Sequence, residues 1–323
     1  MKETLYVRGI SEALDEEMER DDNVLIIGED IGPGAGVFGE TKGLLKKYGP
    51  KRVKQTPISE SAFMGLAIGA ATAGLRPVVD LIFMDFLTVC MDPIVNYAAK
   101  THHMFNGQYK VPMVIMIAAG AGLGAGPQHS QCLEAWFAHT PGLKVVMPSV
   151  PADVKGLMKA AIRDDNPVVY IYNKTLIARR GEVPDDCFVP LGKADIKREG
   201  GDVSIIAAGS MVYDALSAAE TLAGDGISAE VVDLRTISPL DKETILASVK
   251  KTGRAVIVHE AVKDFGIGAE ISAVIAEEAF DYLDAPIRRV AAPFAVLSAA
   301  RNLEKAYLPS AEDIVQAVKS TMA

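Results

Sequence analysis

Hydrophobic and polar positions follow two alternating patterns along the chain. Short apolar runs rich in Val and Ile predict buried strands, and stretches with a period near 3.6 predict helices between them. The predicted strands are 24–27, 78–83, 114–118, 144–147, 168–172, 203–207, 229–232, 255–258 and 288–290. The clearest predicted helices are 3–20, 85–100, 152–163 and 311–322, with one more that follows Ser59. Strands that alternate with helices indicate parallel sheets covered on both faces.

The alternation is interrupted once, by a polar stretch at 173–201 that contains Pro184, Pro190 and several glycines. A chain of 323 residues is long enough for two domains of ordinary size. We therefore expect two doubly wound α/β domains, at 1–180 and 201–323, joined by a linker at 181–200.

The predicted helix after Ser59 is unusual because positions 61–75 carry no charge and many Gly and Ala side chains. Such small faces predict a helix packed closely on all sides, and Ser59 is a favourable N-cap residue. Glu60 then lies in the first turn of a buried helix, where desolvation of a carboxylate is unfavourable and the helix N-terminus offsets only part of it. The sequence alone leaves Glu60 either as a structural helix start or as a functional acid.

The segment 34–39 fits the spacing G-x-G-x-x-G of a dinucleotide-binding turn. Glu29 and Asp30 end the preceding strand, where they would repel a pyrophosphate, and Lys54 stands near the position where an acidic residue is expected. We interpret the segment as a loop and keep a nicotinamide-dependent dehydrogenase as an alternative function.

A second glycine-rich loop alternates Gly with other residues at 120–126 and ends in Gln128-His129-Ser130-Gln131. Such a loop brings bare backbone close to a ligand or to another chain. His129 could act there as an acid, a base or an oxyanion donor, or could be an incidental surface residue. The other histidines show no metal-ligand spacing, and His259 ends a predicted strand without an evident partner.

Charge and cysteine content narrow the classes of function. A net charge of −9 argues against nucleic acid or an anionic membrane as partner. Cys90, Cys132 and Cys187 form no C-x-x-C pair and indicate free thiols of a reducing compartment. The acidic first twenty residues do not resemble a signal peptide, and the uncharged stretch 111–133 contains too many Gly and Pro residues for a membrane span. We expect a cytoplasmic protein.

Five segments, taken together, resemble one family. They are Val53–Glu60, Gln128–Gln131, His139–Val146, Ala161–Val168 and Val232–Asp241. They occur in the family's order and span essentially the whole chain. The resemblance is to the beta subunit of the thiamine-diphosphate-dependent component of 2-oxo acid and acetoin dehydrogenase complexes. It implies a pyrimidine-binding transketolase-like domain followed by a transketolase C-terminal-like domain.

The resemblance also implies partners. Family members are α2β2 heterotetramers that bind thiamine diphosphate between subunits and pass an acyl unit to lipoamide on a transacetylase. The alpha subunit holds the diphosphate and Mg²⁺ through a Gly-Asp-Gly motif followed by an Asn pair. This chain has Gly224-Asp225-Gly226, but Lys250-Lys251 stand where the Asn pair is due. We interpret Gly224–Gly226 as a turn and expect the diphosphate site on another polypeptide.

Site residues follow from the same resemblance. It implies that Glu60 hydrogen-bonds the pyrimidine ring nitrogen of the cofactor, that Phe86 contacts the ring and that Ile82 makes a nearby apolar contact. It gives His129 a role in processing intermediates and in transfer to the lipoyl arm. It also implies a potassium ion held mainly by backbone oxygens, at positions that match Met113, Ala161, Ile162, Asp164 and Asn166.

Two segments depart from the family pattern. The strand 114–118 lacks a usual Arg, and 294–300 lacks a usual Pro-x-Pro-Phe-like motif. Short resemblances at Ser61-Ala62-Phe63, Val89-Cys90 and Met104-Phe105 favour acetoin over pyruvate or branched 2-oxo acids as substrate. A nicotinamide-dependent enzyme and a non-catalytic scaffold, whose glycine loops serve only subunit packing, remain the alternatives from other classes.

Overall fold

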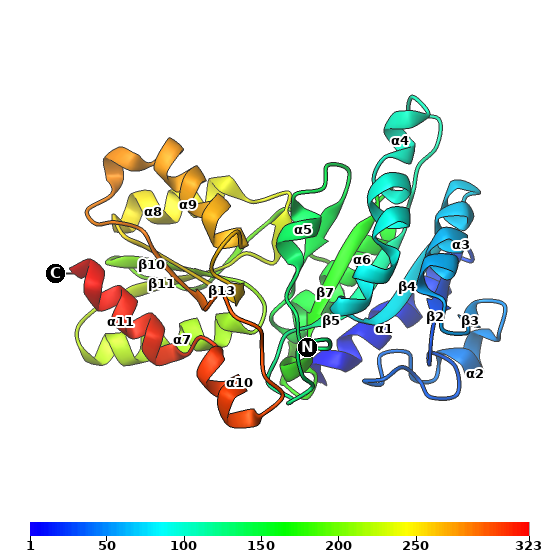
Figure 1. Ribbon diagram of the computed structural model, residues 1–323, viewed down its shortest axis with the longest axis horizontal. Helices are drawn as coiled ribbons and strands as arrows, with labels where there is room; N and C mark the ends of the chain where they lie inside the picture. The colour runs from blue at the N-terminus through cyan, green and yellow to red at the C-terminus, as the bar shows by residue number, and fades with distance from the viewer. Residues whose placement is uncertain (323) are drawn as a thin grey trace. The chain divides into compact units, whose positions relative to one another are not determined.

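The computed structural model describes residues 1–322, and Figure 1 shows its helices and strands. The chain folds into two compact units, and each is described by itself. The first unit comprises Met1–Ala119 and Trp136–Leu191. The second comprises Gly120–Ala135 and the chain from Gly192 onward. The division between the units falls after Leu191, and the second glycine-rich loop joins the second unit.

A parallel sheet organises the first unit. Its strands run in the order β6-β7-β5-β4-β2-β3, and every pairing between neighbours is parallel. The strands are β2 (Val24–Gly28), β3 (Val53–Gln55), β4 (Arg76–Phe83), β5 (Val114–Ala119), β6 (Lys144–Val146) and β7 (Val168–Asn173). The helices are α1 (Tyr6–Arg20), α2 (Leu44–Tyr48), α3 (Glu60–Thr72), α4 (Thr101–Met104) and α6 (Pro151–Arg163). Helix α1 packs against α6, and α3 packs against β4 and β2.

Two predictions in this unit are wrong in detail. The predicted helix 3–20 begins only at Tyr6, because Lys2–Leu5 forms strand β1, which pairs antiparallel with β8 (Arg180–Val183). The predicted helix 85–100 is irregular: a 3₁₀ helix η1 (Met84–Cys90) is followed by a π-helix η2 (Pro93–Ala98). The predicted linker 181–200 contains β8 and β9 (Asp195–Arg198), and its role as a domain boundary stays a prediction.

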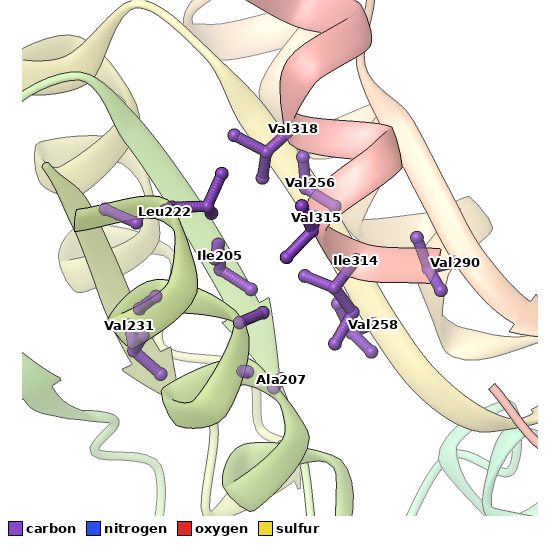
Figure 2. Packing of buried hydrophobic residues seen from close by; sticks show 14 of the residues in the cluster. Ile205, Ala207, Leu222, Val231, Val256, Val258, Val290, Ile314, Val315 and Val318 are labelled. Carbon is purple, nitrogen blue, oxygen red and sulfur yellow. The ribbon is translucent and has the colours of Figure 1, made fainter. Parts of the chain in front are cut away.

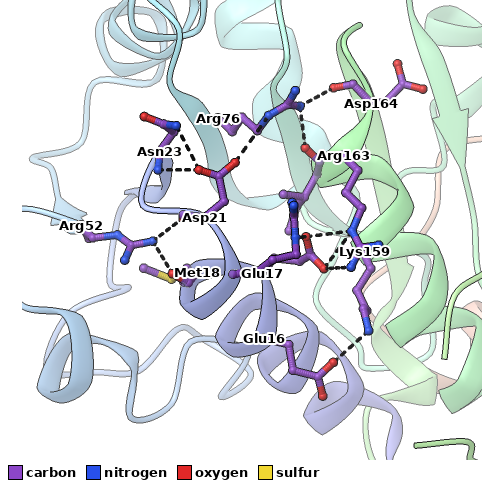
Figure 3. Close-up of polar contacts among 12 residues, drawn as sticks. Glu16, Glu17, Met18, Asp21, Asn23, Arg52, Arg76, Lys159, Arg163 and Asp164 are labelled. Atoms are coloured by element: carbon purple, nitrogen blue, oxygen red, sulfur yellow. Dashed lines mark hydrogen bonds and ion pairs between the residues drawn. The ribbon is translucent and has the colours of Figure 1, made fainter. Parts of the chain in front are cut away.

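Helices α1 and α6 are joined by an ion pair between a buried carboxylate and an exposed arginine, which Figure 3 shows in detail. The Glu17 carboxylate is fully buried and accepts two hydrogen bonds from the Arg163 guanidinium, at 2.6 and 3.0 Å. Arg20 donates to the same carboxylate at 2.7 Å. A buried carboxylate is tolerated only when such partners replace its water, so this cluster fixes how the two helices pack.

Helix α3 is only partly buried, which corrects the prediction of a helix packed on all sides. Ser59 occupies the N-cap position, but its hydroxyl donates to the Pro57 carbonyl instead of capping the helix. Phe63, Met64, Ala67, Ile68 and Ala71 face the core, whereas Ser61, Ala62, Gly65, Leu66 and Gly69 are exposed. The small residues therefore line an uncovered face of the chain.

The second unit contains a smaller sheet with the order β14-β13-β10-β11-β9. All pairings are parallel except that of the edge strand β9. The remaining elements are β10 (Val203–Ala207), α7 (Met211–Gly224), β11 (Ala229–Asp233), α8 (Lys242–Thr252), β13 (Ala255–Val262), α9 (Ile267–Glu278), β14 (Arg288–Ala292), α10 (Arg301–Tyr307) and α11 (Ala311–Met322). Helices α7 and α11 pack on one face and α8 and α9 on the other (Figure 1).

The core of the second unit lies between the sheet and helices α7 and α11. Figure 2 shows Ile205, Val231 and Val256 of the sheet facing Leu222 of α7 and Val315 of α11. These side chains are at most 3% exposed. The two sheets with helices between their strands confirm the predicted α/β class. No helix within residues 1–322 is long and apolar enough to cross a membrane.

Candidate active site

Glu60 is the first residue of α3 and is half-buried. The next residue ties this end of the helix to η1, because the Ser61 hydroxyl donates to the Val89 carbonyl at 2.7 Å. The carboxylate therefore lies at a fixed helix N-terminus, where the helix dipole favours a negative charge. Sequence reasoning placed Glu60 in this first turn, and the structure confirms that position.

A second carboxylate, Glu29 at the end of β2, lies close to Glu60. It is 8% exposed, and Oε1 has no hydrogen-bond partner among residues 1–322. Burial raises the pKa of Glu29, the charge of Glu60 raises it further, and a hydrogen bond from the Ser59 backbone offsets part of this. Burial and the neighbouring acid therefore both favour the neutral form of Glu29.

Ile82 and Phe86 lie on the segment that leads from β4 into η1. Ile82 is buried and has a φ of 63°, a conformation that is strained for a β-branched residue. Its N–H donates to the Asp80 carboxylate at 3.0 Å, within an irregular stretch of β4. Phe86 is half-buried and meets Phe83 edge-on at 5.8 Å between ring centroids. Because η1 packs on α3, Phe86 and Glu60 belong to one region of the first unit.

Asp80 faces another buried acid, Glu40, that sequence reasoning did not identify. Both side chains are fully buried, and one oxygen of each has no partner among residues 1–322. Burial and their mutual repulsion raise the pKa of Asp80, and burial raises that of Glu40. A single proton shared between them would satisfy both oxygens. The only sequence signal was an Asp in the middle of an apolar strand.

Glu40 also decides between the interpretations of the first glycine-rich loop. Its carboxylate accepts the Phe38 N–H at 2.8 Å, and a Cβ at Gly36 would lie within 2.7 Å of both its oxygens. The loop is therefore filled by an acid of the same chain. A pyrophosphate would meet this negative charge, so the geometry speaks against a dinucleotide site.

The second glycine-rich loop belongs to the second unit and carries His129. Gly120, Gly122, Gly124 and Gly126 all have φ between 70° and 101°, which explains their alternation because L side chains rarely adopt this conformation. His129 is half-buried, and its N–H donates to the Gly126 carbonyl at 3.4 Å. Glu60 and His129 thus lie in different units, and their joint role stays a prediction.

Glu134 is a buried acid just beyond this loop. It is 1% exposed, and burial raises its pKa from 4.5 to about 7, with a smaller contribution from the charge of Glu260. In the unfolded chain the carboxyl ionises near its ordinary pKa, so between these values the folded state binds more protons and stability falls as pH rises.

We expect Glu134→Gln to remove the cost of ionising this buried carboxyl. The free energy of unfolding should rise by roughly 3 kcal/mol relative to the wild type at pH 8 and hardly change at pH 4, because the Glu134 carboxyl is then largely protonated in both the folded and the unfolded chain. Urea unfolding at the two pH values measures the difference, with Glu277→Gln as an exposed control. A gain that does not change with pH would show that Glu134 is not the titrating group.

His259, which the sequence places at the end of a predicted strand, lies within β13. It is 1% exposed, and burial lowers its pKa to about 4. Its ring lies against Gly266 and Gly268, where a Cβ would overlap it. Within residues 1–322 no three His, Cys, Asp or Glu side chains form a group that could hold a metal.

Gly224–Gly226 is a turn at the end of α7, as predicted. The Asp225 carboxylate forms an ion pair with Lys319 at 2.8 Å. Asp225 therefore pairs with a lysine of the same chain, which agrees with its interpretation as part of a surface turn.

The residues predicted to hold potassium surround the C-terminal end of α6. Arg76 donates to the carbonyls of Ile162 and Asp164, each at 3.0 Å (Figure 3). The carbonyl of Met113 accepts the Val168 N–H, and the Asn166 amide donates to the Asp164 carboxylate. Carbonyl oxygens at a helix C-terminus suit a monovalent cation, but a guanidinium already uses two of them. Potassium binding stays a prediction, which melting temperatures in potassium and sodium chloride would test.

None of the three cysteines, all within residues 1–322, forms a disulfide. Cys90 and Cys187 are buried. Burial is the main reason why the pKa of Cys90 is raised to about 12 and why the pKa of Cys187 is also raised. Cys132 is half-buried, three residues beyond His129.

Comparison with known families covers both units. Residues 3–179 match the model of the transketolase pyrimidine binding domain, and residues 192–314 match the transketolase C-terminal domain. Among solved structures, a split-gene transketolase described as an inactive β4 tetramer superimposes with a TM-score of 0.83. It is 25% identical, over 99% of each chain. The predicted order of a transketolase-like pyrimidine domain and a C-terminal domain is confirmed.

Curated relatives are much closer in sequence. A mitochondrial pyruvate dehydrogenase E1 subunit beta-2 from Oryza sativa subsp. japonica is 49% identical, over 98% of this chain and 86% of that protein. The beta subunit of an acetoin:2,6-dichlorophenolindophenol oxidoreductase from Cupriavidus necator is also 49% identical, over 97% and 96%. Its counterpart from Bacillus subtilis is 46% identical, over 95% and 93%. Beta subunits of pyruvate and of acetoin enzymes are thus equally similar to this chain.

Proposed function

The chain belongs to the family of beta subunits of thiamine-diphosphate-dependent 2-oxo acid and acetoin dehydrogenases, and on this premise we propose that its own substrate is acetoin. It would cleave acetoin together with an alpha subunit and pass the acetyl unit to lipoamide on a transacetylase. The observation that carries the catalytic part is Glu60, a half-buried carboxylate at the start of α3, the helix that packs on η1, which carries Phe86. The preference for acetoin rests on the short segments around Ser61, Val89 and Met104.

The residues in the first unit fit the aminopyrimidine end of the cofactor. That ring needs an acid for its nitrogen and an apolar or aromatic surface for its face, and Glu60, Phe86 and Ile82 supply these on adjacent elements. The Glu29 Oε1 atom has no hydrogen-bond partner among residues 1–322, which supports a polar contact with a group outside this chain. We infer that these residues bind the pyrimidine end, with Mg²⁺ held elsewhere, since no three His, Cys, Asp or Glu side chains within residues 1–322 form a group that could hold a metal.

Each residue has a separate task in this proposal. Thiamine diphosphate, when bound, supplies the carbanion chemistry. The Glu60 carboxylate would hydrogen-bond the pyrimidine ring nitrogen, and burial together with the charge of Glu60 raises the pKa of the neighbouring Glu29. Phe86 orients the ring and excludes water from it. His129 transfers protons at the reacting end.

A partner chain is part of the proposal because this chain exposes an apolar face beside Glu60. The exposed residues of α3 include Leu66 at 52%, and Ile58 and Val89 nearby are 82% and 54% exposed. Exposed apolar surface of this kind marks an interface. An alpha subunit would hold Mg²⁺ and the diphosphate, and two copies of each chain would form the active heterotetramer.

Reconstitution tests the proposal. We expect the chain alone to show no turnover with thiamine diphosphate and dichlorophenolindophenol, since it holds only part of the cofactor. With an alpha subunit added, acetoin should give a larger kcat/KM than pyruvate or branched 2-oxo acids. A larger kcat/KM for a 2-oxo acid than for acetoin would identify that acid as the substrate. Turnover by the isolated chain would contradict a cofactor site shared with an alpha subunit.

A further inference from the structure

The loop 120–131 is rich in glycine, so its local sequence does little to restrict its backbone conformation. Four of the residues from Gly120 to Gly126 are glycines with positive φ, and glycine loses more backbone freedom on ordering than any other residue. Whatever holds the loop must therefore come from outside it. Three contacts within the second unit do so.

The first contact is with Glu260 in β13. Its Oε1 accepts the Ala121 N–H at 2.6 Å, and its Oε2 accepts the Ser210 hydroxyl at 2.8 Å. Glu260 is 8% exposed, so a solvent molecule does not easily replace these donors. Hydrogen bonds from neutral donors to a carboxylate are among the stronger ones in proteins.

The second contact is with Glu304 in α10. Its Oε2 accepts the Gly124 N–H at 2.9 Å, and the side chain is 3% exposed. The other oxygen, Oε1, has no partner among residues 1–322. Burying a carboxylate with so few partners is unfavourable, which indicates that its position serves the loop more than the stability of α10.

The third contact is packing against the segment before α10. A Cβ at Gly124 would lie 3.4 Å from the Ala299 carbonyl and 3.5 Å from Cγ of Arg301. A Cβ at Gly126 would lie 3.6 Å from Cβ of Ala299. This segment includes the end of 294–300, the stretch that departs from the family pattern, so the departure lies directly beside the loop.

From these contacts we propose that Glu260 and Glu304 are positioning residues for His129. They hold the backbone of the loop at Ala121 and Gly124, and the turn from Gly126 to His129 then sets where the imidazole lies. Neither acid takes part in the reaction. The consequence for catalysis rests on the role proposed for His129, whereas the consequence for the loop does not.

Hydrogen–deuterium exchange of the full chain, read by mass spectrometry, tests the effect on the loop directly. Glu304→Ala should speed exchange in peptides covering 120–131 by roughly 10- to 100-fold, because it removes the side-chain acceptor of the Gly124 N–H. Exchange elsewhere in the second unit should stay as in the wild type. Glu304→Gln keeps an acceptor oxygen and should restore most of the protection. Glu277→Ala, an exposed glutamate of α9, is the matched control.

The catalytic effect is measured in the assembled enzyme. Glu304→Ala should lower the single-turnover rate of acyl transfer at least tenfold and leave the Kd for thiamine diphosphate within a few-fold, with Glu304→Gln close to the wild type. Ser210→Ala, a milder change, should speed exchange at Ala121 if Glu304→Ala does not fold. Unchanged exchange in the loop, or equal acceleration throughout the second unit, would overturn the proposal. Faster exchange in the loop with an unchanged rate of acyl transfer would refute the positioning of His129. If the assembled enzyme is inactive on every donor, the exchange measurement alone decides whether Glu304 holds the loop.

Discussion

Glu60→Gln should abolish most of the activity of the assembled enzyme while leaving its fold intact. The amide preserves the shape of the side chain but cannot hold a proton against the pyrimidine nitrogen as a carboxylate does. We expect exchange of the thiazolium C2 proton to fall by about 10² to 10⁴, which corresponds to roughly 3–5 kcal/mol of barrier. This exchange is measured by NMR after quenching in acid, beside the melting temperature of the same sample.

A purely structural Glu60 predicts the opposite pattern. The substitution would then remove a favourable helix-dipole interaction of about 0.3–1 kcal/mol and leave activity nearly unchanged. It would also relieve Glu29, whose pKa is raised in part by the charge of Glu60, so the change in stability should be small in either case. Glu243→Gln is the matched control, since Glu243 is an exposed glutamate in the first turn of α8. Wild-type exchange in a correctly assembled Glu60→Gln enzyme would move the site elsewhere.

His129→Ala should slow substrate processing or transfer to the lipoyl acceptor by about 10² to 10⁴, the usual effect of losing a positioned acid or base. Cofactor affinity should stay within a few-fold, because His129 is assigned to the reacting end and not to the pyrimidine. Stopped-flow single turnovers with acetoin and with a lipoyl domain separate the two steps. Exposed His103 supplies a matched control in His103→Ala. Identical single-turnover rates in both steps would exclude His129 from the site.

Much of the fold follows from local patterns. Apolar runs such as 203–207 and 255–258 can only be buried strands, and the structure places them at the centre of the second sheet. Lys2–Leu5 was missed because its partner, β8, lies far along the chain, and an isolated N-terminal segment carries no sign of such a pairing. The irregular helices η1 and η2 were missed because each spans only six or seven residues, too short a stretch for the apolar spacing to distinguish 3₁₀ or π turns from α turns.

The position of a candidate residue was predictable where it sits at the end of an element. Glu60 at a helix start and His129 after a glycine loop are of this kind, while their roles stay predictions. Glu40 and Asp80 could not be paired from sequence, since a loop acid and a strand acid meet only in the folded chain. The same holds for Glu304 and the loop it contacts, which are separated by 180 positions. Buried carboxyl groups brought together by tertiary structure are thus the part that sequence reasoning omits.

The unequal accessibility of the three thiols gives this chain a built-in labelling handle. Cys90 and Cys187 are buried, and their raised pKa values keep them protonated and unreactive at neutral pH. Cys132 is partly accessible and follows the glycine-rich loop by one position. A maleimide fluorophore or spin label should therefore attach there first in the native chain, without any engineered cysteine. Its emission or line shape would then report how ordered the neighbouring loop is before and after the alpha subunit binds.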